Sequence, residues 1–186
     1  MSPGAIVALA VGLAMDAFAV CICATASGLS RGWSAYLRLA ITFGCFQSLM
    51  PLIGWLLGVQ LAGWFSALDH WIAFALLVFV GVRMIRSGLK PACRMTADPS
   101  HGWTLLLLAV ATSIDAFAVG ISLAMLAVAI LVPVVAIGVI TFAISLTGAA
   151  LGSRLGLRAG PRMEIAGGVL LLLIGGRILW QHLAGG

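Results

Sequence analysis

Charged side chains are scarce in this sequence. Asp, Glu, Lys and Arg make up only 8% of its 186 residues, whereas 63% of the residues are hydrophobic. A soluble domain of this size carries far more charge on its surface, so the composition excludes that class and predicts an integral membrane protein whose main partner is the lipid bilayer. The few basic residues cluster between apolar runs, which is typical of membrane loops and argues against a nucleic-acid partner.

Other absences narrow the function. The first basic residue, Arg31, follows the first apolar run, so no cleavable signal peptide is expected. The three histidines all fall near the ends of apolar runs, which disfavours an imidazole-rich site deep in the membrane. The four cysteines imply no disulfide framework. We interpret Cys21 and Cys23 as packing residues, with a thiolate site for a soft metal as the alternative. No resident cofactor is expected.

Six apolar runs are long enough to cross a bilayer. They lie at residues 4–26, 39–58, 69–88, 104–125, 129–152 and 165–184. The sequence therefore predicts an all-α membrane protein with six transmembrane helices. Eight Lys and Arg residues belong to the first, third and fifth connections and their borders, and none to the second or fourth. By the positive-inside rule, both termini are expected outside the cytoplasm.

The two halves of the chain resemble each other. The matching stretches are "MDAFAVCIC" (15–23) with "IDAFAVGIS" (114–122), "ITF" (41–43) with "ITF" (140–142), and "GVRMI" (81–85) with "GGRIL" (175–179). The first two matches are offset by 99 residues and the third by 94, so the second half is expected to have lost about five residues after "ITF". Three spans per half make the second half enter the membrane from the opposite side.

This repeat predicts the organisation of the chain. We expect two inverted three-helix repeats, at residues 1–90 and 103–186, joined by a cytoplasmic linker at residues 91–102. Inverted repeats of this kind are typical of secondary transporters, in which the substrate site lies near the middle of the membrane between the repeats.

Each repeat places one aspartate near the middle of its first span, at Asp16 and at Asp115. A charge at that depth costs about 2.5–3.5 kcal/mol on insertion scales. Small residues lie one and two turns away on the same helical face, which predicts that the aspartates face other helices rather than lipid. One interpretation is a neutral pair, hydrogen-bonded across two packed helices. The other is a shared polar site, which the equal depth in both repeats favours.

Two carboxylates brought together out of water require a proton or a cation between them, and a divalent cation fits best. Carboxylate, amide and hydroxyl oxygens suit hard cations such as magnesium or manganese. The candidate ligands are Asp16, Asp115, Gln47, Thr112 and Ser145. Other oxygen-bearing side chains at similar depth are Thr42, Ser48, Ser113, Thr141 and Thr147. Taken singly, each of these hydroxyls is expected to bond its own helix backbone.

Three further features have two interpretations each. Arg83 and Arg177, at matching positions late in spans three and six, either snorkel to the interface or form gates by pairing with carboxylates or helix C-termini. Pro51 either kinks the second span or frees the Gln47 carbonyl as a ligand. The G-x-x-x-G pairs at 54–58 and 148–152 predict close packing of spans two and five against spans one and four, within a monomer or in a homodimer.

The sequence also resembles a known family. The stretches that carry the resemblance are "MDAFAV" (15–20), "FGCFQSLMPLIGW" (43–55), "HWIAFALLVFVGVRMI" (70–85) and "ATSIDAFAVGIS" (111–122). Together they resemble the manganese efflux pump family of the lysine-exporter superfamily. The resemblance implies a bacterial inner-membrane transporter that exports manganese(II), with Asp16 and Asp115 as its membrane-embedded acidic residues. Some family members carry a glutamate at the position of Gln47, so this site is less negative than theirs.

The mechanism expected from these features is alternating access, with proton antiport as a hypothesis. Two alternatives remain open. One is an exporter of another divalent metal, or of a small amino acid or organic cation, built on the same fold. The other is a membrane enzyme, which the absence of a nucleophile and base near the aspartates disfavours.

Overall fold

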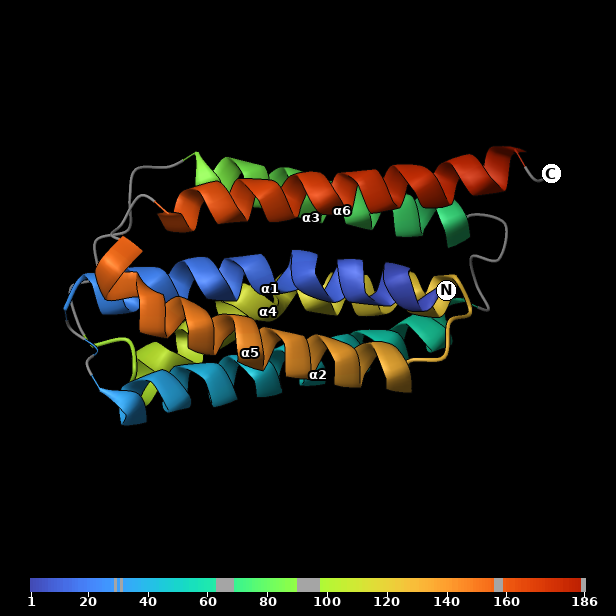
Figure 1. The fold of residues 1–186 in the computed structure, drawn as a ribbon. Helices are drawn as coiled ribbons and strands as arrows, with labels where there is room; N and C mark the ends of the chain where they lie inside the picture. The colour runs from blue at the N-terminus through green and yellow to red at the C-terminus, as the bar shows by residue number, and fades with distance from the viewer. Residues whose placement is uncertain (29, 31, 63–68, 90–97, 156–158, 185–186) are drawn as a thin grey trace.

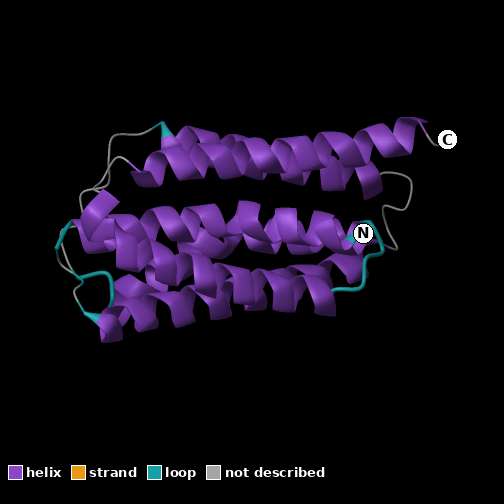
Figure 2. Cartoon of the chain, viewed as in Figure 1, coloured by secondary structure: helices purple, strands orange, loops and turns teal. Residues whose placement is uncertain are grey.

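The computed structural model describes every residue except 29, 31, 63–68, 90–97, 156–158 and 185–186. The described part of the chain contains six α-helices and no β-strand (Figures 1 and 2). The helices are α1 (Pro3–Ala26), α2 (Trp33–Ala62), α3 (Asp69–Gly88), α4 (Gly102–Met125), α5 (Leu131–Leu155) and α6 (Ala159–Ala184). The prediction of an all-helical fold with six helices is therefore confirmed.

The helices differ from the predicted spans mainly in length. α2 begins at Trp33 rather than at residue 39, and α6 begins at Ala159 rather than at residue 165. An apolar count finds only the part of a helix that suits hydrocarbon, whereas backbone hydrogen bonds continue into polar surroundings. The predicted fifth span begins two residues before α5, which starts at Leu131, because the apolar count also includes Ala129 and Ile130 of the preceding connection.

The ends of α1 follow local chemistry. The Ser2 hydroxyl accepts a hydrogen bond from the Ala5 backbone N–H at 3.3 Å, and Pro3 occupies the first turn, where its missing N–H costs nothing. At the other end, Gly28 has a φ of 76°, in the left-handed region that favours glycine. The chain leaves the helix there and turns toward α2.

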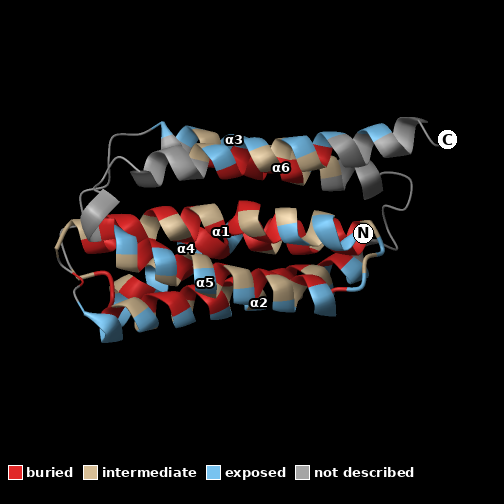
Figure 3. Ribbon diagram, in the orientation of Figure 1, coloured by how far each residue is buried: buried red, intermediate tan, exposed pale blue. Residues whose placement is uncertain are grey.

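The outer surface is that of a membrane protein. Within the described residues, four helical segments are long and apolar enough to cross a membrane, and α6 contributes a shorter apolar stretch, Ile165–Gly176. The four segments are Pro3–Ala26, Trp33–Gln60, Gly102–Met125 and Leu131–Gly152. Large apolar side chains such as Leu56, Phe79 and Val139 are more than half exposed. Figure 3 shows exposed residues along the helices. A surface of this kind requires lipid around it.

The six helices form a closed ring. Passing around it, each helix packs against the next in the order α1, α5, α2, α4, α3, α6 and back to α1. Neighbours in this ring always come from different halves of the sequence. α1 and α4 face each other across the middle with only a small contact. The α3–α6 pair forms a layer beside α1 and α4 (Figure 1), and its interfaces with these two helices are the least extensive in the ring.

Glycines bring the helix backbones close together. A Cβ built on Gly58 of α2 would lie 2.6 Å from the Ala124 Cβ of α4, and a Cβ on Gly148 of α5 would lie 2.7 Å from the Phe18 ring of α1. The other glycine of each G-x-x-x-G pair also lacks room for a side chain. The predicted close packing on the first and fourth spans is confirmed, and each pair contacts a helix from the other half.

Candidate ion site

The two aspartates lie near the middle of α1 and α4, the helices that face each other across the ring. Asp16 is 8% exposed and Asp115 is 1% exposed, so the prediction that they face protein is confirmed. Each Oδ1 accepts a hydrogen bond from the next backbone N–H, Ala17 to Asp16 at 2.6 Å and Ala116 to Asp115 at 2.8 Å. The two side chains are thus held by their helices in the same way.

The two carboxyl groups are adjacent. The Asp16 side chain lies within hydrogen-bonding range of the Asp115 carboxyl group. Asp115 Oδ2 is buried and has no hydrogen-bond donor in the described part of the protein. Carboxylate oxygens only accept hydrogen bonds, so two of them can approach only when a proton or a cation lies between them. The pair is therefore a place for positive charge.

Gln47 of α2 contacts α1 one turn before Asp16. Its side chain is fully buried, and its Nε2 donates a hydrogen bond to the Leu13 carbonyl at 2.9 Å. Leu13 lies one turn before Asp16 and Ala17, and its carbonyl is the usual helical acceptor for the Ala17 N–H, which here also bonds to Asp16. The other atom of the amide, Gln47 Oε1, is buried without a hydrogen-bond donor among the described residues. This oxygen is available to a cation near α1.

Most of the hydroxyl groups at membrane depth belong to one of two classes, and the half-buried Thr42 belongs to neither. Five of them donate to carbonyls of their own helix, as expected for isolated hydroxyls: Thr25, Ser48, Thr112, Ser122 and Thr147. Three others are buried with no hydrogen-bond partner among the described residues: Ser113, Thr141 and Ser145. An unpaired buried polar group costs about 1–3 kcal/mol, so these three require an explanation, and a ligand supplies one for those that face the aspartates.

Ser145 and Thr141 lie one turn apart on α5 and therefore share a helical face. The Ser145 hydroxyl lies beside the Cys21 thiol of α1, which is itself within electrostatic range of Asp16. The hydroxyl is the donor in this contact and the sulfur only a weak acceptor, so the lone pairs of the Ser145 oxygen remain available. Cys21 was interpreted from sequence as a packing residue. Residues five apart on a helix lie about 140° apart around its axis, so the spacing from Asp16 did not mark Cys21 as part of the site.

Two further candidates lie near Asp115 on α4. Thr112 is on the same helical face, one turn before Asp115. Its hydroxyl proton is already committed to the Leu108 and Ala109 carbonyls, at 2.9 and 3.1 Å. Ser113, only two residues before Asp115, points to another side of α4. Thr112 is thus close but occupied, whereas Ser113 is unpaired but directed elsewhere.

The donor set is weak for a permanently bound metal. Among the described residues, no three His, Cys, Asp or Glu side chains come together to hold a metal ion. Two carboxylates with neutral oxygens suit a hard divalent cation that must also leave again. A groove of about 670 Å³ between α2 and α5 is lined by apolar residues such as Leu49 and Val134 and contains neither aspartate. That groove is not the ion site.

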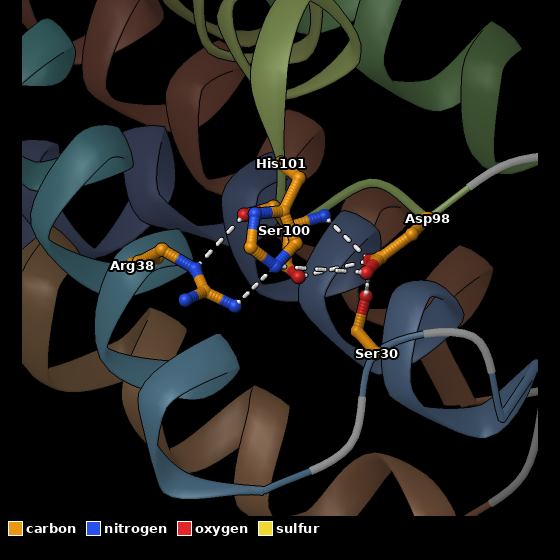
Figure 4. A network of polar contacts seen from close by, with 5 residues as sticks. All are labelled: Ser30, Arg38, Asp98, Ser100 and His101. Carbon is orange, nitrogen blue, oxygen red and sulfur yellow. Dashed lines mark hydrogen bonds and ion pairs between the residues drawn. The ribbon is translucent and has the colours of Figure 1, made fainter.

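A second polar cluster, the Asp98 cluster, lies at one end of the ring and contains Ser30, Arg38, Asp98, Ser100 and His101. Asp98 Oδ1 accepts hydrogen bonds from the Ser30 hydroxyl at 2.7 Å and from the N–H and hydroxyl of Ser100 at 2.9 and 2.8 Å. Arg38 Nε donates to the Ser100 carbonyl at 3.1 Å, and its Nη2 lies 2.6 Å from His101 Nε2 (Figure 4). These contacts join the first and third connections of the chain, which the charge pattern predicts to be cytoplasmic.

The charge of Asp98 is stabilised in this cluster. Although desolvation raises the pKa of Asp98, the hydrogen bonds from Ser30 and Ser100 outweigh it and hold the pKa below its usual value. The sequence analysis did not single out Asp98. A signal was present, because an aspartate two residues before a serine at the start of a helix commonly bonds that backbone.

A ring of membrane-crossing helices around buried carboxyl groups and unpaired oxygens defines a membrane transporter. A family model described as "Mntp: Putative manganese efflux pump" matches residues 30–179. The chain belongs to this MntP family of manganese efflux pumps, as its motifs predicted, and the transporter interpretation is confirmed over the enzyme.

Several curated relatives named "Putative manganese efflux pump MntP" cover nearly the whole chain. A protein from Geobacter sp. (strain M21) is 50% identical over 178 residues, which is 95% of each chain. One from Syntrophotalea carbinolica is 44% identical over 180 residues, also 95% of each chain. One from Enterobacter sp. (strain 638) is 43% identical over the full length of both chains. No solved structure gives a significant match.

Proposed function

We propose that this protein exports manganese(II) across the bacterial inner membrane and binds the ion between Asp16 and Asp115. The observation that carries this proposal is the pair of adjacent, buried carboxyl groups in a member of the MntP family. Gln47 Oε1 and the Ser145 hydroxyl complete the ligand set, and Thr141 joins them from the same face of α5. Thr112 could offer the metal only a lone pair of its hydroxyl oxygen, because the hydroxyl proton is donated to carbonyls of its own helix.

The inverted repeat is supported by matched contacts. Each residue of α2 is compared with the residue 94 positions later in α5, and each residue of α1 with the residue 99 positions later in α4. With these offsets, the contacts between α2 and α4 correspond to the contacts between α5 and α1. The corresponding pairs are Gly54–Phe117 with Gly148–Phe18, Gly58–Ile121 with Gly152–Ile22, and Pro51–Gly120 with Ser145–Cys21. Gly44 and Gly138, also 94 residues apart, contact each other, as two residues on a pseudo-two-fold axis would.

This correspondence revises the alignment of the repeats. An offset of 94 already applies at Gly44, so the five-residue difference between the halves precedes it, and the two "ITF" stretches are not equivalent in space. Gln47 then corresponds to Thr141. Both are buried and both keep an oxygen without a donor among the described residues. The ion site thus contains two equivalent pairs, Asp16 with Asp115 and Gln47 with Thr141.

The orientation and the division of the chain follow from sequence. The charge pattern places the end with the Asp98 cluster in the cytoplasm and both termini outside. Residues 1–90 and 103–186 are proposed as the repeats and 91–102 as the linker. Because the halves alternate around the ring, they are not separate folding units. Their G-x-x-x-G faces are used within one chain, which supports a monomer as the transport unit.

In the proposed mechanism, manganese enters from the cytoplasm and replaces the proton that the aspartate pair holds. Every interface of the ring joins helices from different repeats, so rocking one whole repeat against the other would break all of these interfaces. We therefore propose that the α3–α6 pair, with the least extensive contacts, shifts against the other four helices to open the site outward. Protons returning from outside then favour release of the metal.

Flux measurements on purified protein in lipid vesicles test this function. Vesicles that contain a metal-sensitive dye should show manganese entry, and an opposed proton gradient should accelerate it. Flux that ignores the proton gradient would remove proton antiport from the mechanism. Transport of an amino acid or organic cation without any metal flux would overturn the proposed substrate.

A further inference from the structure

We propose that Arg83 is the protein's own counter-cation, which balances the aspartate pair when no metal is bound and withdraws when the metal arrives. The proposal rests on the proposed function, because it assigns a role in loading and release at the same site. Arg83 is then a positioning residue that competes with manganese rather than a ligand.

The contact that carries this inference crosses from α3 to α4. Arg83 Nη2 donates a hydrogen bond to the Ala111 carbonyl at 3.1 Å. Ala111 lies one turn before Asp115, and helical side chains lean toward the N-terminal turn. The guanidinium and the Asp115 carboxyl group therefore occupy the same turn of α4, and the two charges interact there. They form no direct ion pair in the described structure, so the guanidinium is within electrostatic range of the carboxyl group without contacting it.

The charge balance explains why such an arrangement would respond to a metal. A guanidinium keeps its charge under all ordinary conditions. Two carboxylates with Arg83 carry one net negative charge, which a single shared proton cancels. A divalent cation between the carboxylates instead leaves one net positive charge, so the metal and the guanidinium repel each other. Binding of the metal therefore disfavours the guanidinium in the turn of α4 that contains Asp115, and the guanidinium disfavours the metal.

Withdrawal of Arg83 has a path and a consequence. The side chain is exposed, and a long arginine chain can carry its charge to the headgroup region. The hydrogen bond to Ala111 lies in one of the least extensive interfaces of the ring, between α3 and α4. Its loss on metal binding would free α3 to move, so that occupancy of the site drives the shift of the α3–α6 pair.

The test measures manganese binding and transport by the full chain in lipid nanodiscs and vesicles. Arg83→Gln should lower the dissociation constant for Mn²⁺ about tenfold, because a repelling charge is gone, and lower the maximal transport rate about tenfold, because release is no longer assisted. Arg83→Lys should keep both values near those of the native protein. Arg86→Gln, one turn further along the exposed surface of α3, is the matched control and should change neither.

Three results would overturn the inference. Unchanged binding and transport in Arg83→Gln would make Arg83 a snorkelling residue, and weaker binding would make it a support of the site. If Arg83→Gln does not fold, Arg83→Lys decides alone, since loss of transport there would assign the effect to the hydrogen bond instead of the charge. A native protein that binds no Mn²⁺, with Asp115→Asn indistinguishable from it, would reject the proposed function itself.

Discussion

Hydroxyl side chains on α5 show how little separates a structural residue from a candidate ligand. Thr147 donates to the Ile144 carbonyl of its own helix at 2.8 Å, whereas Thr141 is fully buried with an oxygen that has no partner among the described residues. The free-energy cost of burying an unpaired hydroxyl is offset when the oxygen contacts a ligand during the transport cycle. Thr141 is therefore expected to contact manganese.

Substitution of Thr141 by alanine should weaken manganese binding about three- to tenfold, the value of one hydrogen-bond-like contact to a polar oxygen. Thr147→Ala is the matched control on the same helix and should leave the affinity unchanged. Isothermal titration of both variants with Mn²⁺ measures this difference. Equal effects in the two variants would contradict the assignment of Thr141 to the site.

The sequence was most informative where a polar residue interrupted an apolar run. Asp16, Asp115 and Gln47 were recognisable because burying such groups is costly, and the repeat made the aspartates conspicuous. The hydroxyls were harder to rank, because their partners depend on rotamers and on the neighbouring helix. Thr112 was selected for its place beside Asp115, yet its proton is engaged, whereas Thr141 is not.

Helix pairs in this protein depend on the absence of side chains at a few positions. A Cβ at Gly54 would meet the Phe117 carbonyl oxygen of α4, and this backbone cannot move aside without separating the two helices. Gly176 of α6 has open space around it. The two glycines therefore provide a direct comparison of packed and unpacked positions.

Gly54→Ala should lower the free energy of unfolding by more than about 2 kcal/mol, because it forces α2 away from α4. Gly176→Ala should leave it unchanged or raise it by up to about 1 kcal/mol, since alanine favours helix over glycine. Thermal unfolding of both variants in detergent would show the contrast. A Gly54→Ala variant as stable as the native protein would contradict the close approach of α2 and α4.

The Asp98 cluster should make stability depend on pH. Its pKa is lower in the folded protein than the ordinary value of 3.8, so its contribution is complete above that value and is lost as the pH falls through the lowered folded pKa. Asp98→Asn should therefore lower the melting temperature at about pH 7, and its difference from the native protein should shrink as the pH falls below 3.8.

Serine variants test the same cluster. Ser30→Ala removes one donor to Asp98 and should reproduce part of the loss at neutral pH. Ser34→Ala, at an exposed position in the first turn of α2, should not. A constant difference between Asp98→Asn and the native protein at every pH would contradict the role of the Asp98 charge.

At the scale of the whole molecule, the sequence predicted the number of helices but not their order around the ring. The reason lies in the repeat itself. Because α1 and α4 share the stretch "DAFAV", the glycine face of α2 fits either helix about equally well. Closure of the ring decides the pairing, and it joins α2 to α4 and α5 to α1. Local sequence contains no such information.

The central claim is that the aspartate pair moves manganese. Its most direct test is the manganese content of bacterial cells that lack their own exporter and express the native chain, Asp16→Asn, Asp115→Asn or the control Asp98→Asn at matched membrane levels. The native chain and Asp98→Asn should lower cellular manganese and restore growth in excess manganese, and the other two variants should do neither. Full export by either Asp16→Asn or Asp115→Asn, or no export by the native chain, would contradict the account.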